Sequence, residues 1–446
     1  MAATRLGWGQ PARAAAAAIL LAACPSRALE DGLARTPPMG WRSWNLFGAG
    51  VDQWLMEAIM EGMVSRRRLV DGKPTSLCDL GYCNVGLDDN WQACGKGTDF
   101  FRYHAKNGSR FRPVVDLKRF PDMAGMTARA HRLGLTTGWY GNNCICREHW
   151  PPSEAVYQGD VDALVEFGFD AVKLDGCGSQ YDLNLWQRLL NKSGRPVTIE
   201  NCHWGFTVPR DNWCPWHTYR TSHDVRASYG SVVQNLLTTV TWARRGLSRP
   251  GCWAYPDALE VGCQHGPGGS DDPGLSAAEA RSHFGSWCIV SSPLVISMDV
   301  NNDTIMDSVW PLISNKEAIA VNQAWAGHSG SPFLEAAEEV HLEDFHQNVQ
   351  GASVPHAASA RSWQYFYKPL GAGRVAVLLM NHDSRSQSLR LNFTAVPGSP
   401  CARCGVRDVW THKDLGEMSG VSMDVASHDS AFLVLAPAAA PLSVLV

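Results

Sequence analysis

Short apolar runs alternate with stretches of helical apolar spacing through most of the chain. The runs predict strands at Met39–Asn45, Cys83–Trp91, Thr136–Tyr140, Asp170–Cys177, Val197–Cys202, Thr218–Asp224, Trp253–Asp257 and Pro293–Met298. The helical spacing predicts helices at Asp52–Arg68, Pro121–Leu133, Asp160–Phe167, Leu183–Asn191, Val232–Arg245 and Ser276–Ile289. Strands and helices that alternate in this way are typical of a parallel sheet. We therefore expect an α/β fold, a (β/α)8 TIM barrel.

Three of the predicted strands carry charged residues at their carboxyl ends. These residues are Lys173 and Asp175 in the fourth strand, Asp88 and Asp89 in the second, and Arg220 and Asp224 in the sixth. A (β/α)8 barrel collects its catalytic residues at this end of its strands. An ion pair that holds a strand end is the alternative for Lys173 and Asp175, but it accounts less well for three strands with the same feature.

Past residue 327 the pattern changes to short apolar or alternating segments that are separated by turn residues. They predict strands at Ser362–Tyr367, Val375–Met380, Ser388–Phe393, Val406–Trp410 and Ala431–Leu435. With no helical period between them, these strands indicate a C-terminal antiparallel β-sandwich domain. We expect a signal peptide over residues 1–28, a catalytic barrel over 31–327 and the β domain over 328–446.

The first residues have the order of a secretory signal peptide. Arg5 and Arg13 precede the apolar run Ala14–Ala23, and small residues follow up to Ala28. The run is too short to span a bilayer, and no later stretch is long and apolar enough. We expect a soluble chain of the secretory pathway, either extracellular or in a vacuole or lysosome. An N-terminal anchor is the alternative, because LAAC, which ends at Cys24, also fits a bacterial lipid-attachment site.

The cysteine content agrees with the secretory pathway. The chain has 14 cysteines, and the disulfide candidates are Cys144, Cys146, Cys177, Cys202, Cys214, Cys401 and Cys404. CARC at Cys401 and Cys404 also fits a metal or redox site, but the chain has no second CxxC. Without Cys24 the count is odd, so a thiol stays free, with Cys288 as the candidate.

Four sequons predict glycosylation at Asn107, Asn191, Asn302 and Asn392. The formal net charge of −4 gives no case for a nucleic acid or an anionic membrane surface as a partner.

Several motifs, taken together, resemble a known enzyme family. They are TPPMGWRSWN from Thr36, GYCNVGLDDNW from Gly81, KLDGC from Lys173, YRTSHD from Tyr219, Pro256 with Asp257, SPLVIS and AIAVNQ. In order and spacing they are similar to the glycoside hydrolases of the α-galactosidase and α-N-acetylgalactosaminidase type, from Thr36 to Gly327. The resemblance implies a retaining glycosidase with no metal and no cofactor.

The resemblance also implies roles for single residues. Asp175 is the nucleophile and Asp224 the general acid/base, which a retaining mechanism holds about 5 Å apart. Lys173 favours an ionised Asp175, and Asp224 needs a raised pKa to start protonated. Asp88 and Asp89 match residues at the sugar's 4- and 6-hydroxyls, Arg220 at the 2-hydroxyl and Lys173 at the 3- or 4-hydroxyl, with Trp44 and Tyr140 as walls and Asp257 as a further contact. Core packing is the alternative for the two walls. Cys144 or Cys146 matches the partner of Cys177.

Some residues depart from the family pattern. His203 stands where the α-galactosidases have an acid, and Trp253 to Asp257 lack an asparagine and an acid of the family motif. Gly205 to Thr207 match neither the bulky pair expected of a galactosidase nor clearly the small pair that admits an acetamido group. These departures concern the substrate more than the reaction.

We expect an exo-glycosidase that removes terminal α-D-galactose from galactosides, and a homodimer is compatible with the resemblance. The alternatives are an α-N-acetylgalactosaminidase, a β-L-arabinopyranosidase and a catalytically weak galactoside-binding paralogue. A zinc hydrolase that uses His203, His217 and His223 is a further alternative, but their spacing matches no metal motif.

Overall fold

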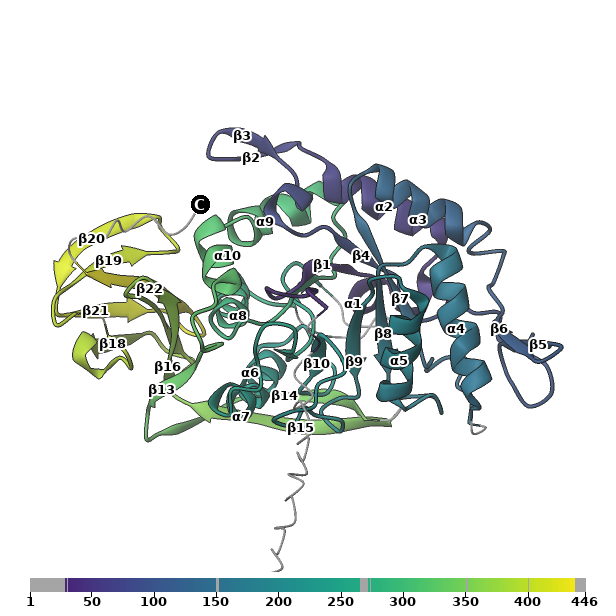
Figure 1. The fold of residues 1–446 in the computed structure, drawn as a ribbon. Coiled ribbons are helices and arrows are strands. Elements are labelled where there is room, and N and C mark those ends of the chain that lie inside the picture. The colour runs from purple at the N-terminus through teal and green to yellow at the C-terminus, as the bar shows by residue number, and fades with distance from the viewer. Residues whose placement is uncertain are drawn as a thin grey trace, which may run out of the picture.

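The computed structural model describes residues 29, 31–149, 152–264, 272, 274–349, 352–399 and 401–437. The expected signal peptide therefore lies outside the described residues. A barrel of strands and helices lies beside a smaller β domain, which is drawn in yellow and light green at the left of Figure 1. None of the helices in the described residues is long and apolar enough to cross a membrane.

Eight parallel strands form the barrel sheet. In sheet order they are β11 (Trp253–Tyr255), β10 (Thr218–Arg220), β9 (Thr198–Cys202), β8 (Ala171–Asp175), β7 (Thr136–Gly141), β4 (Asn84–Gly86), β1 (Met39–Arg42) and β12 (Leu294–Ile296). Just after β11, the Leu259 amide donates to the Val295 carbonyl at 2.7 Å, and Leu259 pairs in parallel with Ile296. This bridge joins the two ends of the sheet, so the expected (β/α)8 barrel is confirmed.

Helices surround the sheet and follow most of the strands. They are α1 (Trp44–Phe47), α2 (Gln53–Val64), α3 (Met123–Arg132), α4 (Glu154–Phe167), α5 (Leu183–Ser193), α6 (Tyr229–Thr238), α7 (Val240–Arg244), α8 (Ala277–Ile289), α9 (Asp303–Ile313) and α10 (Lys316–Gln323). Side-chain caps fix several starts, such as Asp182 before α5 and the Ser276–Glu279 capping box of α8. The faces that point inward carry the apolar residues of the periodic pattern.

Two small hairpins extend from the barrel. They are β2 (Arg68–Val70) with β3 (Lys73–Thr75), and β5 (His104–Asn107) with β6 (Arg110–Pro113). The second hairpin lies between the predicted strand Cys83–Trp91 and the predicted helix Pro121–Leu133, where the sequence analysis names no element. The first predicted strand also differs, because it ends at Arg42 and Trp44 begins α1 instead of ending the strand.

The C-terminal domain is an antiparallel sandwich, as expected. Its larger sheet has the order β13 (Ser331–Glu335), β16 (Trp363–Gly371), β17 (Arg374–Asn381), β22 (Ser430–Pro437), β19 (Cys404–Asp408) and β20 (Lys413–Met418). The smaller sheet pairs β18 (Gln387–Asn392) with β21 (Gly420–Val425), and β14 (Glu339–Val349) pairs with β15 (Ala352–Arg361) in a long hairpin. Alternate residues of β17 point in opposite directions: Val377 belongs to the sandwich core, whereas Leu378 belongs to the barrel core.

Candidate active site

A cavity of about 230 Å³ opens at the carboxyl ends of the barrel strands. Of the residues that the sequence nominates, those that line it are Trp44, Asp88, Tyr140, Lys173, Asp175, Arg220, Asp224 and Asp257. They come from β4, β7, β8, β10 and β11 or from the segments just after these strands, and Trp44 comes from α1. The end of the barrel at which these side chains meet is the end where (β/α)8 enzymes carry their chemistry. A larger cavity of about 630 Å³ lies at the opposite end, near the first residues of the strands, and none of these eight residues lines it.

Asp175 is the last residue of β8 and is buried in this cavity. Its Oδ2 accepts a hydrogen bond from the Tyr140 hydroxyl at 2.8 Å, and its Oδ1 accepts one from the Gly176 amide at 2.7 Å. The Lys173 ammonium lies 3.9 Å from Oδ2. These contacts fix the direction of the carboxylate.

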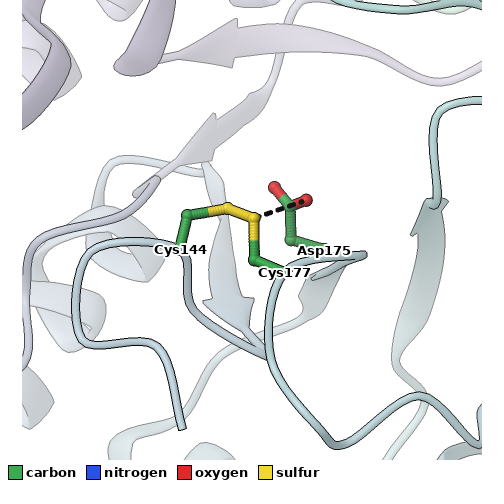
Figure 2. A group of neighbouring side chains, drawn as sticks. All are labelled: Cys144, Asp175 and Cys177. Atoms are coloured by element: carbon green, nitrogen blue, oxygen red, sulfur yellow. Dashed lines mark hydrogen bonds between the residues drawn. A yellow bond between two sulfur atoms is a disulfide. The ribbon is translucent and has the colours of Figure 1, made fainter. Parts of the chain in front are cut away.

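A disulfide lies beside this carboxylate (Figure 2). Cys144 and Cys177 are bonded to each other, and Cys177 Sγ lies 3.8 Å from Asp175 Oδ1. The bonded sulfur has no hydrogen to donate, so this is a packing contact. The disulfide joins the segment after β7 to the segment after β8 and braces the end of the strand that carries Asp175.

The pKa of Asp175 results from opposing influences. Burial raises it, Lys173 lowers it, the charges of Asp224 and Asp88 raise it, and the Tyr140 hydrogen bond lowers it, with the outcome at about 7. Lys173 therefore favours the ionised form, as the sequence suggests, but burial outweighs its effect.

Asp224 lies in the segment that follows β10, and its side chain is 31% exposed. Its Oδ1 accepts hydrogen bonds from Arg220 at 3.0 Å and from the Trp204 indole at 3.2 Å. The same guanidinium nitrogen of Arg220 lies 2.9 Å from Asp257 Oδ2. Arg220 is itself buried, so it holds the two carboxylates of Asp224 and Asp257 on one side of the cavity.

Asp88 and Lys173 form a buried pair on the other side of the cavity. The Lys173 ammonium donates to Asp88 Oδ2 at 2.8 Å, and the Asp88 amide donates to the Ser43 hydroxyl at 3.0 Å. A carboxylate and an ammonium that share one wall of a cavity present both an acceptor and donors to hydroxyl groups.

Asp89, which we expect at a sugar hydroxyl, is not among the residues that line the cavity. Its Oδ2 accepts the amides of Cys144 and Ile145 at 2.9 and 2.8 Å, and its Oδ1 accepts the Gln92 amide group at 2.9 Å. Burial raises the pKa of Asp89. Oδ2 thus holds the loop after β7, whereas Oδ1 holds the segment after β4.

His203 is also absent from the cavity lining, although the sequence nominates it as a substrate contact. Its Nδ1 lies 2.8 Å from the Thr207 hydroxyl, and the Tyr181 ring stacks on it at 3.9 Å. Burial lowers the pKa of His203 to about 4, so the ring is neutral near pH 7. His217 lies elsewhere and contacts Asp31 at 3.0 Å, so the structure does not bring these histidines together as zinc ligands.

Five residues that the sequence does not nominate for the site also line the cavity: Asn45, Arg147, Gly176, Trp204 and Phe206. His223, which the sequence offers only as a zinc ligand, lines it as well. Asn45 donates to Glu260, whose pKa burial raises to about 8. Trp204 and Phe206 lie in the same segment as His203, just after it, so the sequence points to the correct segment but not to the side chains that face the cavity.

The described residues contain five disulfides, which confirms the expected disulfide framework. They are Cys78–Cys83, Cys94–Cys146, Cys144–Cys177, Cys214–Cys252 and Cys401–Cys404. Cys202 is a buried free thiol, so the expectation that it forms a disulfide is wrong. Cys288 is free, as expected, and so is Cys263. The four sequon asparagines, Asn107, Asn191, Asn302 and Asn392, are exposed.

Two family models match the chain in the order of its two domains. The model described as alpha galactosidase A matches residues 36–324, and the model described as alpha galactosidase C-terminal beta sandwich domain matches residues 360–435. The chain belongs to the alpha-galactosidase family. This membership confirms the resemblance that the sequence motifs indicate, and it makes the chain a glycoside hydrolase.

Individual members of the alpha-galactosidase family cover nearly all of the chain. An alpha-galactosidase of Oryza sativa subsp. japonica is 28% identical over 426 residues, which are 92% of this chain and 87% of that protein. The crystal structure of alpha-galactosidase I from Mortierella vinacea has a TM-score of 0.71 at 23% identity and covers 92% of this chain and 99% of its own. An alfa-galactosidase from Saccharomyces cerevisiae, solved with raffinose, has a TM-score of 0.70 at 21% identity and covers 93% of this chain and 100% of its own. The Mortierella vinacea and Saccharomyces cerevisiae structures both share the fold of this chain.

Proposed function

We propose that this chain is a retaining exo-glycosidase that removes terminal, non-reducing α-D-galactose from galactosides. One observation carries the proposal: Asp175 and Asp224 line the same cavity at the carboxyl ends of the barrel strands. Membership of the alpha-galactosidase family supports galactose as the sugar.

In this proposal Asp175 attacks the anomeric carbon and forms a covalent glycosyl intermediate. Asp224 donates a proton to the leaving oxygen and then, as a carboxylate, takes a proton from the water that releases galactose. Tyr140 and the Gly176 amide aim the Asp175 carboxylate, and Arg220 with the Trp204 indole aims Asp224. Two displacements, each with inversion, give overall retention of configuration.

The remaining cavity residues suit the recognition of one sugar ring. Asp88 and Lys173 offer an acceptor and donors for hydroxyls on one side, and Arg220 with Asp257 does so on the other. Trp44 and Tyr140 add aromatic surface, which covers the apolar face of a sugar. The cavity holds about 230 Å³, a size that favours a single terminal residue over an internal one.

The test is hydrolysis of aryl α-galactoside by the purified chain and by Asp175→Asn and Asp224→Asn. Both variants should lose about a thousandfold or more in kcat/KM, because each removes a group that acts in the transition state. Asp211→Asn is the matched control, since the Asp211 side chain is 84% exposed and does not line the cavity. Full activity in either catalytic variant contradicts the proposed roles.

Two further aryl glycosides distinguish the alternatives in the same assay. If the chain prefers the α-N-acetylgalactosaminide or the β-L-arabinopyranoside, that sugar takes the place of galactose in the proposed function, and the proposed mechanism stands. If galactose binds but none of the three glycosides is cleaved, the chain is a binding paralogue.

The disulfides also bear on the expected processing and location of the chain. The five disulfides support the secretory pathway, with the extracellular space, a vacuole or a lysosome as the destination. We retain a signal peptide over residues 1–28, a barrel over 31–327, a β domain over 328–446 and a homodimer as proposals.

A further inference from the structure

One long hairpin lies between the two segments that the family models match. The models match residues 36–324 and 360–435, whereas β14 (Glu339–Val349) and nearly all of β15 (Ala352–Arg361) lie in between. In Figure 1 this hairpin runs from the β domain along the barrel, below α6. It therefore lies outside the parts of the fold that those models describe.

The hairpin is docked on α6 (Tyr229–Thr238). The Gly230 amide donates to Glu343 at 2.6 Å, and the Gln234 side chain donates to the Ser359 carbonyl at 2.7 Å. A Cβ on Gly230 would lie 2.8 Å from the Ala358 Cβ, so the two elements approach as closely as a glycine allows. This contact fixes the hairpin relative to the barrel.

The same helix supports the segment that carries Asp224. The Asn235 side chain donates to the carbonyls of His223 and Pro256 at 3.0 and 2.9 Å. His223 precedes Asp224 directly and lines the cavity. The hairpin and the catalytic segment are thus held by one helix.

Strand alternation places His356 on the face of the hairpin that is turned toward the barrel. Ala358 and Ala360 of β15 are buried, and His356 lies on the same face because side chains repeat every second residue. Phe345 pairs with His356 across the hairpin, is buried, and has its ring 5.2 Å from the His356 ring. His356 itself is exposed, although its neighbours on this face are covered.

The charge of His356 also acts on His223, which lines the cavity. Burial lowers the pKa of His223, the charge of Asp224 raises it, and the charges of Arg220 and His356 lower it. The geometry agrees with this influence: His356 lies on the face of the hairpin that packs on α6, and Asn235 of α6 donates to the carbonyl of His223.

The edge of the cavity nearest Asp224 is where the leaving group must pass. In the proposed mechanism Asp224 protonates the leaving oxygen, so whatever is attached to this oxygen lies next to Asp224 and its neighbours. Phe206 is one of them: it lines the cavity, its ring contacts the His223 ring edge-on at 5.9 Å, and it is 64% exposed. An exposed aromatic ring next to imidazoles offers a stacking face and hydrogen-bonding groups.

We propose that Phe206, His223 and His356 form a binding site for a second sugar ring on the leaving-group side of the cavity, with His356 supplied by the hairpin. This inference rests on the proposed function, because it concerns the leaving group of that reaction. The ligand is the sugar to which the terminal galactose is attached. The hairpin thus makes the chain selective for oligosaccharide galactosides over galactosides with small leaving groups.

The test compares raffinose, whose leaving group is a disaccharide, with α-galactosyl fluoride, whose leaving group is a single atom. For each enzyme the readout is kcat/KM for raffinose divided by kcat/KM for the fluoride. His356→Ala and Phe206→Ala should each lower this ratio about three- to tenfold, the loss expected for one hydrogen bond or one stacking contact. Both side chains are exposed, so their removal leaves the core packing intact.

His346→Ala is the matched control. His346 lies on the same hairpin, is exposed, and follows Phe345, so it points to the opposite face. Its ratio should equal that of the unchanged enzyme. Turnover of both substrates at a constant ratio in His356→Ala and Phe206→Ala overturns the second-sugar site alone. If the unchanged enzyme cleaves neither substrate, the proposed function fails and the second-sugar site fails with it.

Discussion

The charge state of Asp175 is the central question at the scale of single residues. A nucleophile must be ionised, yet burial raises the pKa of this carboxyl to about 7 despite the nearby Lys173 and the Tyr140 hydrogen bond. Because the pKa in the folded chain is raised, the protonated and inactive fraction grows as the pH falls below about 7. The site therefore depends on small contacts that stabilise the carboxylate.

We expect kcat/KM for aryl α-galactoside to fall about tenfold per pH unit on the acid side of this pKa. In Tyr140→Phe the acid limb should move to higher pH, since the variant loses the hydrogen bond that favours the ionised carboxylate. A pH profile of kcat/KM for both enzymes measures the shift. An acid limb at the same pH in both enzymes contradicts this role of Tyr140.

At this scale the sequence indicates where the chemistry lies better than which side chains take part in it. Asp88 and Asp89 have the same chemistry and are neighbours, but only Asp88 lines the cavity. Successive side chains near the end of a strand point to opposite sides. A shift of one residue in the position where the strand ends therefore decides whether Asp88 or Asp89 faces the cavity. Likewise, His203 is turned to Thr207, while Trp204, whose φ is +46°, faces Asp224. A backbone turn of this kind leaves little trace in the sequence.

Among the elements, the β5–β6 hairpin depends on a buried cluster around His104. Its ring nitrogens lie 2.7 Å from Glu148 and 3.0 Å from Asp160. Burial alone lowers the pKa of His104, but Asp160 and Glu148 outweigh this effect and raise it to about 9. Glu148 also accepts the amides of Arg102 and Tyr103 at 2.8 and 2.9 Å, so the cluster ties the loop to α4.

This cluster should make stability depend on pH. The folded pKa of His104 is above the ordinary value of 6.5, so its stabilising effect is complete below pH 6.5 and is lost as the pH rises through about 9. The free energy of unfolding should fall by on the order of 3 kcal/mol over this range, and His104→Asn should remove most of that dependence. Urea unfolding at several pH values measures it, with the exposed His149→Asn as the control. An equal slope in His104→Asn and the unchanged chain contradicts the assignment.

Burial explains which elements the sequence reveals. The barrel strands are covered on both faces, so they appear as apolar runs and their order is predicted correctly. The hairpin of β14 and β15 packs on α6 through small residues such as Ala358 and Ala360, which give a weak apolar pattern. In α9, Pro311 lies inside the helix, where a proline ordinarily indicates an end. These elements are found only in the structure.

For the whole molecule, the barrel and the β domain share one core. Residues of the larger sandwich sheet, including Leu378 and Phe432, join the same buried cluster as Phe284 and Trp287 of α8. Arg407 of β19 donates to Glu317 of α10 at 2.7 Å, and Arg281 of α8 pairs with Asp429. A continuous core implies that the two domains unfold together, although separate domains commonly unfold in separate steps.

Gly285 of α8 tests this coupling, because it faces the β domain. A Cβ there would lie 2.9 Å from the Trp410 ring and 3.1 Å from Leu378. Gly285→Val should therefore push the two domains apart and destabilise the chain by about 2 kcal/mol, the usual cost of overpacking a core. Calorimetry should show a single transition for the unchanged chain and a lower Tm or a split transition for the variant. Gly50→Val is the control, since nothing lies within 4 Å of a Cβ at that position. Separate transitions in the unchanged chain, or an unaltered Tm in Gly285→Val, mean that the domains fold independently and that their contact contributes little to stability.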